Sequence, residues 1–162
     1  RPTNIYGAGD IPLDIWGARN PAFFRRLTRN QPVTLPNDGR ALLQPGHVSE
    51  LGEAFALALE SPHSIGRIYN ISSARAVELR VYLDILKGIL KSSSPVDFAS
   101  AELLLERYLP ENKINEGGLR FVVEHMCVDI SRARAELGFD PQISLEEGLA
   151  ENLQWMCEKG LI

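Results

Sequence analysis

Few residues of this chain combine a reactive type with a useful spacing. His125 and Cys127 stand two residues apart, as metal ligands often do. Two ligands do not complete a zinc site, and no second pair is spaced to join them. Gly7 and Gly9 lack the helix start that a phosphate-binding glycine turn requires. These patterns predict no metal site and no catalytic residue.

Three polar residues are candidates for ligand binding. Asn4 ends a strand-like segment, so its amide either contacts a substrate or caps the strand. His47 lies at a predicted strand–helix junction, where a packed, hydrogen-bonded imidazole is favoured over a general base. Arg120 is either a ligand contact or a solvated side chain, because guanidinium groups pair bidentately with phosphate.

A strand–helix–strand unit over residues 42–72 must position these groups. Ser49 is predicted to cap the helix, and the residue before Pro62 to end it. Residues 68–71 are predicted to resume as a strand. The helix shows an apolar face at helical spacing, formed by Leu51, Ala54, Phe55, Ala58 and Leu59. We expect Phe55, with Trp155 near the end of the chain, to lie in the core.

The remaining elements follow from caps and periodicity. Helices are predicted from Asn20-Pro21, over 77–90 and 100–109, from Asp129 to Gly138, and from a capping box at Ser144. Strands are predicted at 1–6, 33–35, 41–43, 96–98 and 121–123. The strands at 33–35 and 41–43 are predicted to pair as a hairpin. A loop is predicted over 111–119. This alternation predicts a mixed α/β (α+β) fold in which 1–6 and 68–72 are pieces of a sheet whose other strands lie elsewhere, because a free-standing doubly wound sheet would need more strands.

Composition bounds the function. The 162 residues contain 44% hydrophobic and 23% charged residues, typical of a globular domain. A net charge of −4 makes a nucleic-acid partner an unfavoured interpretation. Two cysteines do not build a disulfide framework, and no apolar run could cross a bilayer, so we expect a reducing, cytoplasmic location without a membrane partner. The chain begins at Arg1, within a strand-like phrase, and is expected to be part of a longer protein.

Several phrases together resemble the second half of extended short-chain dehydrogenase/reductases, the NAD-dependent epimerase/dehydratase family. They are RPTNIYGAGD at 1–10, PGHVSELGEAF at 45–55, GRIYNIS at 66–72 and a long phrase at 129–155. In that family the N-terminal half holds the dinucleotide on a Gly-rich turn and carries a Tyr-x-x-x-Lys. Neither motif occurs here. The resemblance therefore implies a single C-terminal substrate-binding domain over 1–162, with the N-terminal dinucleotide-binding half absent. It also implies that this chain carries the last strands of a Rossmann-like sheet and is an incomplete doubly wound domain.

The resemblance also assigns roles to residues. It places Pro2 and Thr3 where the backbone passes the nicotinamide, and Asn4 on an asparagine that contacts substrate. Tyr6 falls on the family's YGPG turn, in which Ala8 replaces the proline, and His47 on its HV phrase. Leu43 stands where many members have a phosphate-binding arginine. The implied substitutes are Arg40 and Arg120, which completes the predicted substrate set of Asn4, Tyr6, Arg40, His47 and Arg120.

The parent implied by this resemblance transfers a hydride between a nucleotide sugar and NAD or NADP, as an epimerase, dehydratase or related reductase. We expect no cofactor bound to this chain alone and no turnover by it. The implied partners are a nucleotide-sugar-like small molecule, the Rossmann half and a second copy in a homo-oligomer. A non-catalytic binding module derived from the same family is the alternative, distinguished by whether a Tyr-x-x-x-Lys precedes Arg1.

Overall fold

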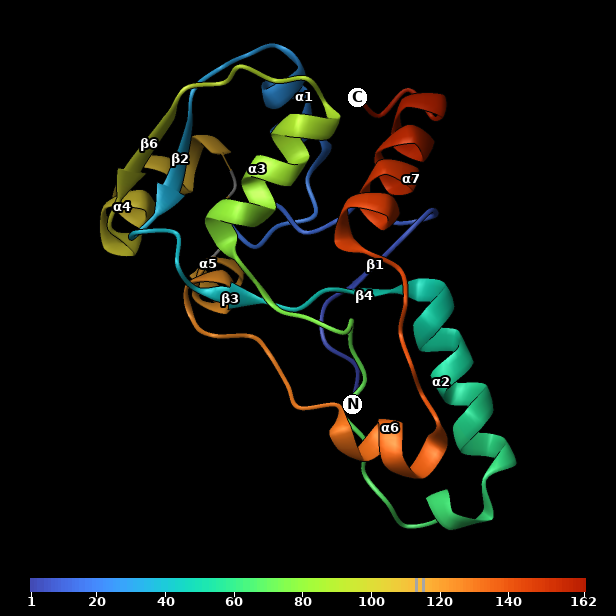
Figure 1. Cartoon of the computed structure of the whole chain (residues 1–162). Helices are drawn as coiled ribbons and strands as arrows, with labels where there is room; N and C mark the ends of the chain where they lie inside the picture. Colours follow the sequence, from blue (N-terminus) through green and yellow to red (C-terminus); the bar gives the residue numbers. More distant parts are fainter. Residues whose placement is uncertain (113, 115) are drawn as a thin grey trace.

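The computed structural model describes residues 1–112, 114 and 116–162 of the chain (Figure 1). The described helices are α1 (Pro21–Thr28), α2 (Val48–Glu60), α3 (Leu79–Ile89), α4 (Ala101–Asn112), α5 (Glu116–Val123), α6 (Ser131–Leu137), α7 (Leu145–Glu158) and the 3-10 turn η1 (Pro62–Ser64). The described strands are β1 (Ile5–Tyr6), β2 (Val33–Pro36), β3 (Leu42–Leu43), β4 (Gly46–His47), β5 (Val77–Glu78) and β6 (Val96–Ala99). The predicted mixed α/β class is confirmed.

The described strands pair in twos and do not form one continuous sheet. β1 pairs in parallel with β4, β2 in parallel with β6, and β3 antiparallel with β5. The predicted hairpin between 33–35 and 41–43 is therefore wrong. The turn between them does form, with Gly39 N donating to Pro36 O. A turn signal fixes a chain reversal but not which strands pair after it.

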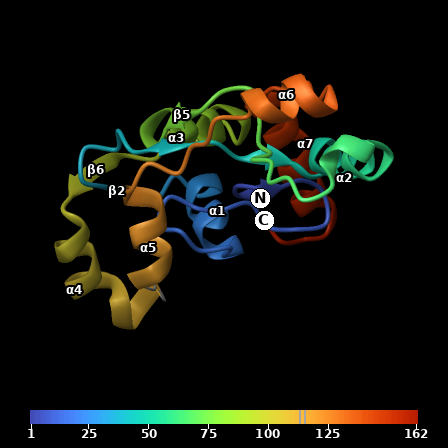
Figure 2. The same ribbon diagram turned by 90° about the horizontal axis from the view of Figure 1, so that it is seen from below.

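Two hydrophobic clusters form the core. The larger one lies among α1, α3 and α7 and includes Phe24, Leu83 and Leu153. The smaller one lies between α2 and α6 and includes Ala54 and Phe139. Figure 1 shows α2 and α6 together at lower right, well away from α4 and α5. The view from below in Figure 2 shows the same separation. β1 lies where the two parts meet, because Tyr6 belongs to the larger cluster and Ile5 packs against the smaller one, and β4 pairs with it.

Local capping was predictable at three helix ends. Asn20 Oδ1 accepts from Ala22 N at 3.0 Å, and Ser144 forms the expected capping box with Glu147. Gly138 ends α6 in the left-handed region at φ +71°. The predicted cap at Ser49 is wrong, because α2 begins at Val48 with His47 at the N-cap position. Ser49 lies in the first turn of the helix, and its Oγ is 2.8 Å from His47 Nδ1.

The apolar face of α2 is wider than the surface that covers it. Leu51 and Ala54 are buried against residues 69–71 and α6, as predicted. Phe55 and Leu59 are 60% and 88% exposed, so the expectation that Phe55 lies in the core is wrong. Apolar periodicity shows that a face will be covered but not by which segment. Trp155, also expected in the core, is half-buried against the larger cluster.

The segment after α4 differs most from expectation. Residues 121–123 belong to α5 and not to a strand, because Leu119 and Val122 are buried three residues apart on one side of a helix. Of the predicted loop over 111–119, residues 113 and 115 lie outside the described residues, and 116–119 begin α5. The predicted strand at 68–71 is reduced to one parallel bridge between Pro2 and Ile71. Within the described part of the chain, no helix has the length and apolar character to cross a bilayer.

Candidate functional site

The pairing of β1 with β4 brings most of the predicted site residues together. Ile5 lies opposite Gly46 and Tyr6 opposite His47. Gly46 N donates to Asn4 O at 2.8 Å, which fixes the start of β1 against the start of α2. The structure thus gathers Asn4, Tyr6 and His47 at one strand junction, with Pro2 and Thr3 leading into it.

Thr3 belongs to a small polar network that joins three segments. Thr3 Oγ1 lies 2.6 Å from Ser72 Oγ, and both hydroxyls lie within 2.6 Å of Gln44 O. Gln44 Nε2 in turn donates to Ser73 O, and Gln44 Oε1 accepts from Val128 N at 2.8 Å. The Thr3 hydroxyl is therefore engaged inside the protein. Only the main chain of Pro2 and Thr3 remains for the predicted contact with a nicotinamide, and that role stays a prediction.

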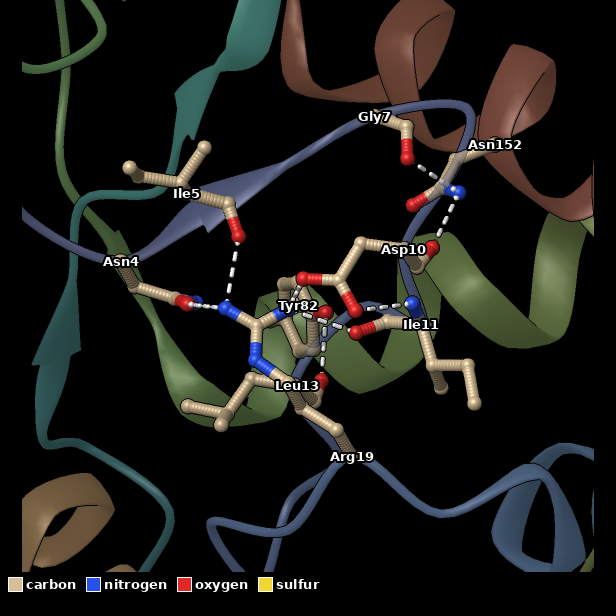
Figure 3. Close-up of polar contacts among 9 residues, drawn as sticks. All are labelled: Asn4, Ile5, Gly7, Asp10, Ile11, Leu13, Arg19, Tyr82 and Asn152. Carbon is tan, nitrogen blue, oxygen red and sulfur yellow. Dashed lines mark hydrogen bonds and ion pairs between the residues drawn. The ribbon is translucent and has the colours of Figure 1, made fainter.

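A second polar network surrounds Asn4 (Figure 3). Arg19 Nη2 donates to Asn4 Oδ1 at 3.0 Å and to Ile5 O at 2.8 Å. Arg19 Nη1 donates to Ile11 O at 2.6 Å and lies 3.0 Å from Asp10 Oδ2. The turn after β1 is thereby tied to the side chain of Asn4.

The same turn is anchored from the other side by α7. Asn152 Nδ2 donates to both Gly7 O and Asp10 O at 2.9 Å. Asp10 N donates to Gly7 O, which closes the turn despite the replacement of the family's proline by Ala8. The main chain that carries Asn4 is consequently fixed at both ends.

Tyr6 and His47 are packing residues. Tyr6 is 2% exposed and His47 4% exposed, with their rings edge to face at a centroid distance of 5.3 Å. Burial, and then the negative charge of Glu50, raise the pKa of the Tyr6 hydroxyl far above its ordinary value. His47 Nε2 has no hydrogen-bond partner and lies 3.8 Å from Glu151 Oε2. The favoured interpretation of His47 as a packed histidine agrees with this burial, and its role toward substrate stays a prediction.

Glu50, in the first turn of α2, binds the segment that precedes α7. Its side chain is 7% exposed, and its Oε1 accepts from Gln142 N and Ile143 N at 2.5 and 2.7 Å. These two residues precede α7, so one carboxylate on α2 holds the segment that enters α7. The family usually has an aspartate at this position, and the longer glutamate reaches the amides here.

The two arginines proposed as a phosphate clamp lie on different elements. Arg40 is exposed and lines an open cavity of about 550 Å³ with Asp38, Arg80 and Phe98. Arg120 is exposed on α5 and pairs with Glu116 at 2.6 Å. Their ion pairs in the described part of the chain, Arg40 with Asp38 and Arg120 with Glu116, involve neither Asn4 nor His47. Their roles in substrate binding stay predictions.

A more enclosed cavity begins one residue after Ser72. Its volume is about 390 Å³, within the usual range for small-molecule sites. It is lined by residues 73–75, Val77 and 141–146, so the segment held by Glu50 forms one of its walls. The polar network of Thr3 and Ser72 lies at its edge.

Sequence reasoning missed the residues that orient the site. Four residues that received no predicted role make its most extensive hydrogen bonds: Arg19, Asp10, Gln44 and Asn152. Asp10 and Asn152 lie within the family phrases at 1–10 and 129–155, but the resemblance assigned them no role. Asp10 and Arg19 lie near Asn4 in sequence, and their opposite charges were the one available signal. Asn152 had no such signal, because its partners lie more than 140 residues away.

The buried carboxyl of Asp14 predicts a dependence of stability on pH. Asp14 is 1% exposed, and burial raises its pKa from 3.8 to about 6, although Trp16 N and Ala18 N both donate to its Oδ1. Because the native state binds this proton more tightly, the associated stability is present below pH 4 and is lost as the pH rises through 6. We expect the free energy of unfolding to fall by roughly 3 kcal/mol on this account.

The measurement is urea unfolding between pH 4 and 7. The Asp14→Asn variant keeps an acceptor oxygen for both amides, and its stability should vary less with pH by about that amount. Asp84→Asn, which changes an exposed carboxyl on α3, serves as the matched control. Equal pH profiles for wild type and Asp14→Asn would contradict the assignment.

The fold is that of part of a Rossmann-type α/β protein. Residues 1–72 match the model of the NAD dependent epimerase/dehydratase family. The predicted resemblance to extended short-chain dehydrogenase/reductases is thereby confirmed.

Named relatives agree with this placement. The chain is 28% identical over 155 residues to the chloroplast stem-loop binding protein of 41 kDa b of Arabidopsis thaliana, covering 94% of this chain and 37% of that protein. It is 26% identical to dTDP-glucose 4,6-dehydratase of Streptomyces griseus, covering 96% and 41%. The chain thus spans well under half the length of these relatives.

Solved structures show the same fold. UDP-glucose 4-epimerase of Thermotoga maritima, determined with UDP-glucose, is similar at a TM-score of 0.69 and 23% identity, with 98% of this chain and 45% of that chain covered. UDP-glucuronic acid 4-epimerase of Bacillus cereus, determined with NAD, is similar at a TM-score of 0.70 and 18% identity, with 98% and 44% covered. At these identities the likeness shows the fold alone.

Proposed function

We propose that residues 1–162 form the substrate-binding domain of an NAD(P)-dependent nucleotide-sugar epimerase or dehydratase, an isomerase or oxidoreductase of the cytoplasm. The dinucleotide-binding half would lie in a segment outside these residues. The observation that carries the proposal is the fixed side-chain amide of Asn4, at the position where the family contacts substrate, beside Thr3 and the β1–β4 junction.

In this proposal the chain binds and orients the substrate. The amide of Asn4 donates to an oxygen of the nucleotide sugar, while the networks around Thr3 and Arg19 keep the main chain in place. Such positioning can supply a large part of an enzyme's rate enhancement. A bound nicotinamide would supply the hydride acceptor for oxidation of a sugar carbon.

The residues of this chain could contact only the nicotinamide end of a dinucleotide. Pro2 and Thr3 offer main chain, and the Thr3 hydroxyl is already bonded to Gln44 and Ser72. The chain has no Gly-rich turn before a helix and no Tyr-x-x-x-Lys. NAD or NADP would therefore be held by the other half, with no binding to this chain alone.

Calorimetry with separate ligands tests this proposal. We expect the chain to bind UDP or dTDP weakly, to bind NAD without measurable affinity, and to show no turnover of UDP-glucose. Asn4→Ala should weaken nucleotide binding about tenfold, the effect of losing one hydrogen bond to a charged group. Binding of NAD at low micromolar concentration by the chain alone would contradict the assignment.

The exposed apolar surface along α2 is where we place the Rossmann half, and a second copy when that half is missing. Phe55, Ile68 and Tyr69 line a groove of about 250 Å³ on this surface. The amino group of Arg1 donates to Tyr69 O at 2.7 Å, so a preceding segment would start beside it. Large apolar patches favour association. Sedimentation should show self-association of the chain, and a monomer at high concentration would contradict this.

A non-catalytic binding module is the second candidate. The observation that favours it is the relative named as a stem-loop binding protein. The net charge of −4 opposes it, because nucleic-acid affinity arises largely from basic residues. Salt-dependent binding of an RNA stem-loop by the chain, together with no affinity for UDP, would favour the module over the enzyme.

A further inference from the structure

We propose that Arg19 is a positioning residue of the ligand site. It orients the side-chain amide of Asn4 so that the NH2 group, and not the carbonyl oxygen, is available to a ligand. The site then selects ligand groups that accept hydrogen bonds, such as phosphate or sugar oxygens. This inference rests on the proposed function and adds to it a residue that no family phrase contains.

The orientation of Asn4 follows from the chemistry of its neighbour. A guanidinium carries only donors, so the atom of Asn4 that faces it must be the acceptor Oδ1. Arg19 Nη2 donates to this oxygen at 3.0 Å and to Ile5 O at 2.8 Å. A rotated amide would place its own NH2 group against these donors. The Asn4 oxygen is therefore the atom bonded to Arg19, as the dashed line in Figure 3 shows, and the NH2 group is left for another partner.

Arg19 is committed to this role because its terminal nitrogens already meet acceptors. Nη1 donates to Ile11 O at 2.6 Å and pairs with Asp10 Oδ2 at 3.0 Å. The carboxylate of Asp10 compensates the positive charge, and Asp10 Oδ1 accepts from Ile11 N at 2.8 Å. Arg19 thus connects β1 to the following turn. Because its donors are used in these bonds, the direct contact with a phosphate is assigned to Asn4.

The ion pair of Arg19 and Asp10 is also connected to α7. Asn152 Nδ2 donates to the main-chain oxygens of Gly7 and Asp10, so the main chain that carries the Asp10 carboxylate is tied to that helix. A chain of hydrogen bonds accordingly runs from α7 through Asp10 and Arg19 to Asn4. These hydrogen bonds hold the Asn4 amide in its orientation before a ligand binds.

A double-mutant cycle in the complete natural polypeptide tests the inference, with UDP as the probe. We expect Arg19→Leu and Asn4→Ala each to weaken UDP binding about tenfold, and the double variant to be no weaker than either single variant. Arg19→Lys, which retains a donor and the charge, should recover part of the affinity. Arg29→Leu removes an exposed arginine at the end of α1 and should leave affinity unchanged.

A ligand-free readout accompanies the cycle. In the wild type the side-chain NH2 of Asn4 should give two separate, rigid NMR signals, which become mobile in Arg19→Leu and stay rigid in Arg29→Leu. A hundredfold loss in the double variant would show that Arg19 binds the ligand directly, and would overturn the inference. Mobile signals already in the wild type would also overturn it. Absence of UDP binding by the wild type would refute the proposed function, while the NMR signals would still decide the role of Arg19.

Discussion

Replacing Gly17 by alanine is expected to lower the free energy of unfolding by about 4 kcal/mol. Gly17 has φ +78°, where an L side chain costs roughly 1–2 kcal/mol. A Cβ at this position would lie 1.8 Å from Gly118 O and 2.7 Å from Gly118 Cα. These atoms are main chain of α5, so no rotamer change can relieve the overlap. The loop that carries Asp14 and Trp16 must then separate from α5, whose Leu119 and Val122 are buried in the larger core.

Gly66→Ala is the matched control for this prediction. Gly66 has φ +74°, nearly the same as Gly17, yet a Cβ there would have no atom within 4 Å. It should lose only the conformational part, about 1 kcal/mol. Urea unfolding of both variants separates the close approach of α5 from the backbone conformation. Equal losses in the two variants would show that α5 does not press on the loop as described.

Elements whose signals are local were predictable from the sequence. The cap at Asn20, the capping box at Ser144 and the left-handed Gly138 depend on residues within four positions of one another. The strand at Val96–Ala99 was also found, but its partner was not. Pairing joins residues far apart in the chain, and the sequence between them carries no record of it. The helix 121–123 was misread because two β-branched residues lie within a short apolar run.

The candidate site was predictable only at the positions to which the family resemblance assigned a role. It supplied Pro2, Thr3, Asn4, Tyr6 and His47, and the structure gathers these residues at one junction. It assigned no role to Arg19, which lies outside the family phrases, or to Asn152, which lies within the phrase at 129–155, since both roles arise from distances in the folded chain. Arg40 and Arg120 were chosen for their charge, and charge alone does not place a side chain. The exposure of Phe55 likewise depends on what covers α2, which periodicity does not reveal.

Replacing Glu50 by alanine is expected to lower the free energy of unfolding by about 3 kcal/mol. Its buried Oε1 is the acceptor for Gln142 N and Ile143 N, and both amides would lose a charge-assisted hydrogen bond. A hydrogen bond to a charged group contributes roughly 1.5–3 kcal/mol, and water can replace part of it at these partly exposed amides. Glu50→Gln keeps one acceptor oxygen for the two amides and should lose only about 1 kcal/mol. Glu53→Ala, an exposed glutamate on the same helix, should change stability by less than about 0.5 kcal/mol.

The Glu50→Ala substitution should also have a local effect on the segment before α7. Gln142 and Ile143 line the cavity of about 390 Å³ next to Ser72, so Glu50 determines the shape of that cavity as well as the entry into α7. Hydrogen exchange of these two amides should accelerate in Glu50→Ala and remain slow in Glu53→Ala. If stability fell while both amides stayed protected, the loss would come from packing of the Glu50 side chain, and the cavity wall would not depend on its carboxylate.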